Sequence, residues 1–225
     1  MSPRHGARLA ALLAPLALLA PAVAHAESVS VDDANGDAKA LNIGAVFGEI
    51  LTGMPVEGPF LLEAPAETST DVVRTTVDHA RKRLTLTFQF RDLVEVEGHS
   101  ADIRIRTSSG RYDLVVGSVG GTTTADLVPG GGFVVTDDGD GDVTLPKPCR
   151  TVRARYDVAA DTLTTSAPTS CLGSPRWVQV SATATRTRIT PQADGSANFA
   201  VWADDAFRSR LSENSMGRSP KVRRG

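Results

Sequence analysis

One stretch of the chain alternates strictly between apolar and polar side chains over the length of a full strand. From Leu84 to Phe90, Leu and Phe occupy every second position, and Thr and Gln stand between them. Successive side chains of a β-strand point to opposite faces, so this period of two predicts a strand with one buried and one solvated face. The β-branched run 72–78 precedes it, and the break at residues 79–82 makes the pair a predicted β-hairpin.

Similar patterns recur along the chain, with turn residues between them. The further strand candidates are residues 101–105, 111–119, 133–135, 143–145, 152–158, 162–166, 177–185 and 199–202. The Gly- and Thr-rich stretch 120–132 is predicted to be a loop. About eight to ten short strands at close spacing, without a strand–helix rhythm, predict an all-β protein, an antiparallel β-sandwich that is jelly-roll-like in outline.

The first 26 residues carry the features of a cleaved signal peptide. Arg4 and Arg8 form a basic start, an apolar run of residues 9–20 follows, and Ala24-His25-Ala26 matches the small-x-small cleavage pattern. We therefore expect a secreted, extracellular protein. No Cys lies near the cleavage position, so a lipid anchor is not expected, and no second apolar stretch is long enough for a membrane span.

The net charge argues against two classes of partner. The chain has 24 Lys and Arg against 26 Asp and Glu, a formal charge of −2. Loss of Arg4 and Arg8 with the signal peptide changes this charge to −4. Such weak acidity favours neither nucleic acid nor an anionic membrane as a partner.

We expect four segments along the chain. Residues 1–26 form the signal peptide, 27–70 an irregular N-terminal segment with a candidate short helix near residue 46, 71–207 the β-sandwich domain, and 208–225 a basic disordered tail. The Gly and Pro content of residues 41–66 favours a loop packed on the core. Asp204 and Asp205 are candidate caps for one helical turn after the last strand.

Cys149 and Cys171 are the whole cysteine content. In an oxidising compartment, an isolated pair at this spacing is most simply one structural disulfide. A redox-active or metal-binding pair is the alternative, but the spacing is far from C-x-x-C, and neither a His nor a third Cys is near. We predict that the bridge stabilises the protein by about 3 kcal/mol in the chain-entropy model.

Two acidic, Gly-containing runs are candidate Ca²⁺ sites, because Ca²⁺ prefers oxygen ligands and Gly lets carbonyl groups turn inward. Neither run matches an EF-hand loop, and Asp-Gly is also common in hairpin turns. The candidate ligands are Asp137, Asp138, Asp140 and Asp142 in one run, and Asp32, Asp33, Asn35 and Asp37 in the other. We expect no required cofactor; Ca²⁺ is the one candidate.

Histidines and tryptophans are few. His79 and His99 are the histidines outside the signal peptide, and a triad of His99, Ser100 and Asp102 would point to different faces of one strand. We therefore expect a protein that is not an enzyme. Trp177 is predicted to pack in the core, beside the disulfide. Trp202 is the candidate ligand-binding aromatic, although the alternation allows it to lie inside or outside.

Three segments resemble a group of secreted actinobacterial β-sandwich proteins of unknown function. They are Asp71–Leu93, the stretch from Cys149 to Asp157, and the stretch from Pro168 to Val180, which is the most specific. The group is distantly similar to DOMON and family-9 carbohydrate-binding modules. The resemblance implies an exported, non-catalytic β-sandwich and assigns no functional residues.

These observations predict a secreted, non-enzymatic binding module. A cell-wall or environmental glycan is the expected ligand, bound by loops at one end of the sandwich. The alternative is a structural or protein-interaction module of the cell envelope, with an envelope protein as its partner. A hydrolase with unrecognised acidic residues is the third hypothesis. Neither nucleic-acid binding nor membrane insertion after cleavage is expected.

Overall fold

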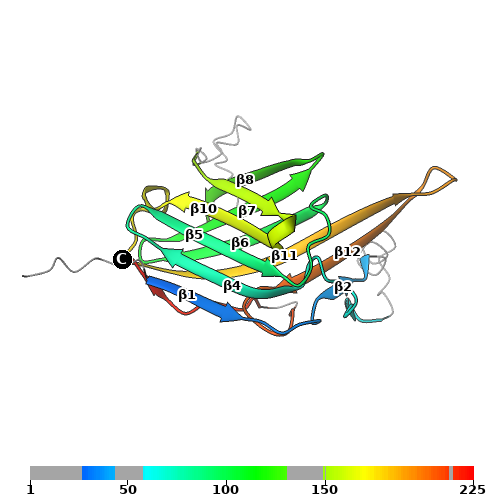
Figure 1. Ribbon diagram of the computed structural model, residues 1–225, viewed down its shortest axis with the longest axis horizontal. Coiled ribbons are helices and arrows are strands. Elements are labelled where there is room, and N and C mark those ends of the chain that lie inside the picture. The colour runs from blue at the N-terminus through cyan, green and yellow to red at the C-terminus, as the bar shows by residue number, and fades with distance from the viewer. Residues whose placement is uncertain (1–26, 44–57, 131–148, 150, 213–214) are drawn as a thin grey trace, which may run out of the picture.

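Two antiparallel sheets packed face to face form the protein, as the alternation predicted. The computed structural model describes residues 27–43, 58–130, 149, 151–212 and 215–225. The first sheet has the strand order β1-β4-β5-β10-β9. The second has the order β3-β2-β12-β11-β6-β7-β8, with the short β13 paired to β11. In Figure 1 the first sheet lies in front of the second.

The strands are of unequal length. Those of the first sheet are β1 (Glu27–Asp32), β4 (Val72–His79), β5 (Arg83–Phe90), β10 (Thr162–Pro168) and β9 (Arg153–Asp157). Those of the second are β3 (Leu61–Glu63), β2 (Lys39–Leu41), β12 (Ala197–Asp205), β11 (Trp177–Pro191), β6 (His99–Thr107), β7 (Arg111–Val119), β8 (Thr122–Pro129) and β13 (Val222–Arg223). Two short 3-10 helices, η1 (Val158–Ala160) and η2 (Thr169–Leu172), flank β10.

The core lies between the inner faces of the sheets. In β5, Leu84, Leu86, Phe88 and Phe90 are each at most 2% exposed, and the polar residues between them are half-buried. Burying one such side chain contributes about 1.5–3 kcal/mol. The opposite face of the core comes from alternate residues of β6 and β11, among them Ile103, Ile105, Val178, Val180 and Ala182. The period of two therefore determines which face of each strand is buried.

Two segments that were predicted to be irregular are strands. The expected loop 120–132 contains β8, because Gly120 and Gly121 take positive φ and close a two-residue hairpin turn between Val119 and Thr122. The N-terminal segment contributes β1, β2 and β3. β1 is an edge strand, with Val29 and Val31 packed on the core. Because its other residues are polar, the sequence was predicted to be irregular there. The candidate helix near residue 46 lies mainly outside the described residues.

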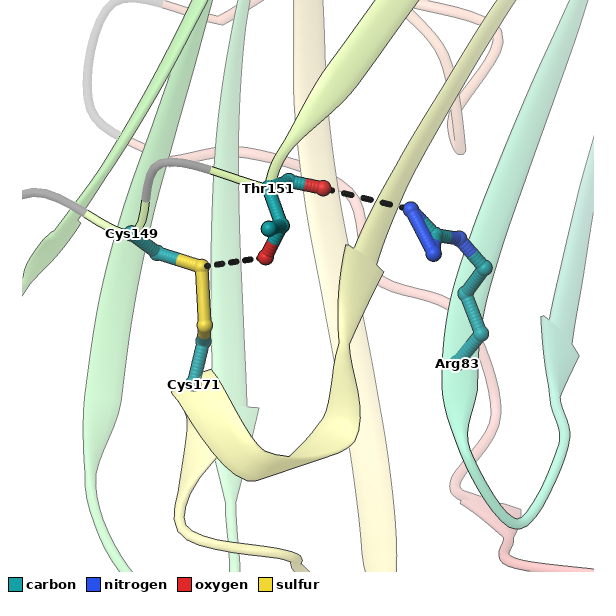
Figure 2. Close-up of a disulfide and its surroundings, with 4 residues drawn as sticks. All are labelled: Arg83, Cys149, Thr151 and Cys171. Atoms are coloured by element: carbon teal, nitrogen blue, oxygen red, sulfur yellow. Dashed lines mark hydrogen bonds between the residues drawn. A yellow bond between two sulfur atoms is a disulfide. The ribbon is translucent and has the colours of Figure 1, made fainter.

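The disulfide prediction is confirmed. Cys149 and Cys171 are bonded, with their Cα atoms 6.1 Å apart. Figure 2 shows that the bridge joins the chain just before β9 to helix η2, and that Thr151 lies beside it. The Nη2 of Arg83, from β5, donates to the carbonyl oxygen of Thr151 at 3.2 Å. The bridge therefore ties a chain end of β9 to the turn that follows β10.

The prediction of a disordered tail from residue 208 is wrong for the last seven residues. Val222 and Arg223 form β13 against the start of β11, and the Val222 side chain is 1% exposed. Ser219 exchanges hydrogen bonds with Val180, donating its N–H to the Val180 carbonyl and accepting the Val180 N–H on its Oγ. The prediction was wrong because it rested on the basic composition of the tail, whereas burial of Ser219 and Val222 fixes this segment to β11.

The expected helical turn after Asp204 is also absent. Asp204 and Asp205 are the last residues of β12, and a turn at residues 206–207 and a bend at residues 208–210 follow them. The side chain of Asp205 accepts the backbone N–H groups of Phe207 and Gly217 instead of capping a helix.

Removal of residues 219–225 is expected to destabilise the protein by about 3 kcal/mol, since Val222 loses its burial and the Val180 amide loses its partner. Urea unfolding of the truncated and intact proteins measures the change as a lower midpoint concentration. The full-length variant Arg223→Gln, altered at an exposed side chain, is expected to unfold like the wild type. Equal midpoints for the truncated and intact proteins would mean that the tail contributes nothing.

Candidate functional site

Four arginines line a pocket on the outer face of the second sheet. Arg104 and Arg106 come from β6, Arg111 from β7, and Arg218 from the C-terminal segment. The pocket has a volume of about 190 Å³, and Met216 lies in its wall. Arg104 and Arg106 point outward because the residues between and beside them, such as Ile105, face the core.

The C-terminal segment completes this arginine pocket. Gln179 of β11 donates from its Nε2 to the carbonyl oxygen of Ser219 at 3.0 Å, which holds residues 215–219 along the sheet. Ser181, two residues further along β11, faces outward and is 6% exposed, because this segment covers it. Arg218 is therefore brought beside arginines more than 100 positions earlier in the chain.

The arginines are unevenly neutralised. Arg104 forms an ion pair with Asp113 at 3.4 Å, whereas Arg106, Arg111 and Arg218 make no ion pair within the described residues. Arg106 and Arg111 stand directly opposite each other in the β6–β7 register. Like charges at such positions are destabilising. Guanidinium groups bind carboxylate and phosphate through paired N–H donors, so the pocket is chemically suited to an anionic group.

Sequence reasoning did not identify this pocket. A signal was present, because Arg104 and Arg106 occupy the polar positions of an alternating strand and Arg111 follows the next turn. The contribution of Arg218 had no local signal.

A second group of charged residues lies where the N-terminal chain crosses from one sheet to the other. Asp33 and Asp37 come from the β1–β2 connection, Asp71 directly precedes β4, and Asp204 and Asp205 end β12. One carboxylate oxygen each of Asp37, Asp71 and Asp204 lies within 4.8 Å of the others. We call these five residues the aspartate cluster.

Backbone amides position the deeper carboxylates. Asp204 is fully buried, and its side chain accepts the N–H of Val72 at 2.8 Å and of Asp205 at 2.9 Å. The first bond links β12 to β4 across the two sheets. Gly36, whose φ of 81° suits glycine, donates its N–H to Asp71 Oδ2 at 2.7 Å. Asp71 also pairs with Arg91 at 3.1 Å.

Several buried oxygen atoms of the cluster have no hydrogen-bond partner. They are both carboxylate oxygens of Asp37, Oδ1 of Asp71 and Oδ2 of Asp33. Asp71 is 0% exposed. Asp205 differs from these residues, because Phe207 and Gly217 donate to its two oxygens and Arg208 lies 3.5 Å away.

Burial raises the pKa values of the cluster. Loss of hydration and, to a smaller extent, the neighbouring carboxylates together raise the pKa of Asp204 to about 9, against the opposing effect of the Val72 amide. Burial likewise raises the pKa of Asp33 to about 6. The pKa values of Asp37 and Asp71 are raised by burial first, and that of Asp37 also by Asp71. The ionised cluster is therefore unfavourable without a counter-charge.

The structure divides the first predicted calcium run. Asp33 and Asp37 belong to the aspartate cluster, whereas Asp32 forms a surface ion pair with Arg74 at 2.6 Å and Asn35 is exposed. The second run, Asp137, Asp138, Asp140 and Asp142, lies outside the described residues. Asp71 and Asp204 were not predicted as ligands, because nothing local to either residue marks it.

Trp202 is half-buried on β12, and cations cover its ring. The guanidinium carbons of Arg186 and Arg188 lie 5.8 and 5.4 Å from the ring centroid. Arg186 is itself 3% exposed and pairs with Glu67 and Glu95. Trp177, predicted to be core, is also half-buried, and its ring contacts the Lys221 ammonium group at 4.4 Å.

Beyond Trp202, β11 and β12 continue as a two-stranded arm that projects from the sandwich (Figure 1). Strand β6 ends its pairing with β11 at Arg186, and β2 ends its pairing with β12 at Val201. On this arm Ile189 and Phe199 are cross-strand neighbours, 58% and 57% exposed.

No family model matches this chain, and no curated protein matches it in sequence. Among the described residues, no helix is long and apolar enough to cross a membrane.

The surroundings of the buried His99 predict how the stability of the fold depends on pH. It is 2% exposed and contacts the rings of Phe90 and Tyr156. Burial and, to a smaller extent, Arg186 together lower its pKa to about 4, against the opposing effect of Glu95. Unfolding therefore allows His99 to take up a proton between pH 6.5 and pH 4.

We expect His99 to contribute stability at pH 7 that is lost as the pH falls from about 6.5 to about 4, by up to about 3 kcal/mol. The buried carboxyl groups, whose pKa values are raised, make the free energy of unfolding increase as the pH falls, which is the opposite effect. Both proteins contain these carboxyl groups, so the difference in stability between the wild type and His99→Gln isolates the histidine. Urea unfolding of the wild type and of His99→Gln across this range should show their stabilities converging at low pH. A constant difference between the two would contradict a neutral buried His99.

Proposed function

We propose that this protein is a secreted, non-enzymatic β-sandwich that binds an anionic cell-wall or environmental glycan in the arginine pocket. The observation that carries the proposal is the gathering of Arg106, Arg111 and Arg218, without acidic partners in the described structure, around one pocket. Their charge contrasts with the weak net acidity of the chain. A carboxylate or phosphate group of a polymer would supply the missing counter-charge.

The geometry of the pocket favours binding of one charged group at a time. Its volume of about 190 Å³ is below the range of about 300–1,000 Å³ usual for drug-sized ligands. It lies on a sheet face, where a long polymer can pass across it. The disulfide, together with the signal peptide and the resemblance to carbohydrate-binding modules that the sequence predicts, supports an extracellular role. The cation-covered ring of Trp202 offers less support for sugar stacking there.

The triple variant Arg106→Gln, Arg111→Gln, Arg218→Gln is expected to lose at least tenfold in affinity for purified cell walls or an acidic polysaccharide. Pull-down with increasing protein concentration measures the affinity, and raised salt should weaken wild-type binding. The matched control changes three exposed arginines elsewhere, Arg81→Gln, Arg153→Gln and Arg223→Gln, with the same change in net charge.

The control variant is expected to bind like the wild type. Equal losses in both triple variants would mean that general charge, and not this pocket, holds the polymer. Retention of full affinity by the pocket variant, or failure of the wild type to bind any acidic polymer, would overturn the proposal.

The exposed pair on the arm favours a second candidate, a protein-interaction module of the cell envelope. Ile189 and Phe199 expose apolar surface on a ribbon that has free edges in the described structure. A partner protein would cover both side chains.

For this second candidate, Phe199→Ser is expected to remove specific crosslinks between the protein and an envelope protein, while its thermal unfolding stays like that of the wild type. Val119→Ser, at an exposed apolar residue of the β7–β8 turn (75% exposed), is the control. Unchanged crosslinks in the Phe199 variant would exclude the arm as the contact.

A further inference from the structure

The partnerless oxygens of the aspartate cluster lead to an inference that is independent of glycan binding. We propose that the cluster binds one Ca²⁺ ion, with Asp37, Asp71 and Asp204 as its carboxylate ligands and Asp33 at its edge. The ion would join the β1–β2 connection to the ends of β4 and β12.

The spacing of the carboxylates fits one ion. Ca²⁺ binds oxygen at about 2.3–2.6 Å, so two ligand atoms on opposite sides of it are at most about 5 Å apart. Ligand oxygens of Asp37, Asp71 and Asp204 lie within 4.8 Å of one another. Three carboxylates on three separate segments therefore already surround a common point.

The second observation is the lack of partners at buried atoms. Both oxygens of Asp37 and Oδ1 of Asp71 are buried and accept no hydrogen bond, although Asp71 is 0% exposed. Such groups are normally satisfied in native proteins, and each exception calls for a partner. Asp204 and Asp205 each have a backbone donor at both oxygens, so the oxygens that lack a partner belong to Asp37, Asp71 and Asp33, and Asp204 would ligate through an oxygen that also accepts an amide N–H.

The donor set selects the class of metal. The three proposed ligands are carboxylates alone, and Ca²⁺ is a hard cation that takes oxygen ligands, whereas Zn²⁺ favours Cys and His. Backbone amides from Gly36 and Val72 hold Asp71 and Asp204 in place, so the site is oriented before an ion arrives. Arg91 pairs with Oδ2 of Asp71 and leaves Oδ1 without a partner.

Protonation is the competing way to neutralise the cluster. Buried carboxyl groups can stay uncharged, and the folded protein would then need no ion. The two possibilities predict opposite effects of Ca²⁺ on the intact protein, because only a metal site gains stability from the ion.

The experiment uses the purified full chain, first stripped with EDTA. Calorimetric titration with CaCl₂ is expected to show that one Ca²⁺ ion binds per chain. The melting temperature should rise by about 5–10 °C when the Ca²⁺ concentration is a hundred times the dissociation constant. Titration with MgCl₂ is expected to show at least tenfold weaker binding.

Asp37→Asn is the decisive variant, because the Asp37 carboxylate has no hydrogen-bond partner whose loss would unfold the protein. It is expected to bind Ca²⁺ at least tenfold more weakly and to lose the rise in melting temperature. In EDTA its melting temperature should equal or exceed that of the wild type, since one buried charge is removed. Asp32→Asn, at the surface ion pair with Arg74, is the matched control and should bind normally.

Three results would overturn the proposal. They are the absence of Ca²⁺ binding to the wild type, Mg²⁺ binding of equal strength, and full Ca²⁺ binding by Asp37→Asn. The variant Asp138→Asn, Asp140→Asn is expected to keep the ion. Loss of binding in that variant, with retention in Asp37→Asn, would place the ion in the other acidic run.

Discussion

Burial of one sheet face against the other is the constraint on which the rest of this structure depends. Leu86 and Phe88 of the first sheet belong to the same buried cluster as Ile103 and Val180 of the second, so each sheet keeps the apolar face of the other from water. Most charged residues of the strands therefore lie on the outer faces or at strand ends, and the few polar residues buried within a strand, such as Thr75 and Thr165, have hydrogen-bond partners. The arginine pocket and the aspartate cluster occupy these two kinds of place, and neither interrupts the apolar layer.

The buried carboxylates of the aspartate cluster lie at strand ends and in the loop between β1 and β2. Asp71 and Asp204 lie at a strand start and a strand end, where unpaired backbone amides are available to them. Asp204 connects the sheets directly through the Val72 N–H. Desolvation of several carboxylates in one place is costly, and hydrogen bonds satisfy only part of the cluster. The remaining buried oxygens are stable only with a proton or a cation beside them, so the cluster is a candidate binding site.

On the outer face of the second sheet, charged side chains are exposed to water and not buried as in the aspartate cluster. Arginines there stay hydrated, so their mutual repulsion is small enough for the fold to tolerate Arg106 opposite Arg111. The C-terminal segment adds Arg218 because Ser219 and Val222 fasten it to β11. A segment that looks basic and unstructured by composition is in fact part of the pocket wall, so its folding and the proposed binding are coupled.

The amino-acid sequence by itself determined the local features of this protein. Period-two alternation predicted the main strands and the sandwich, and the two cysteines predicted the bridge. It also marked Asp33 and Asp37 as candidate ligands. Only the tertiary structure decided that Asp71 and Asp204 join them, that Arg218 lines the same pocket as Arg106, and that residues 222–223 of the tail form a strand. These contacts connect residues tens to more than a hundred positions apart, and no local period encodes them, because strand order is set by how whole sheets bury their faces.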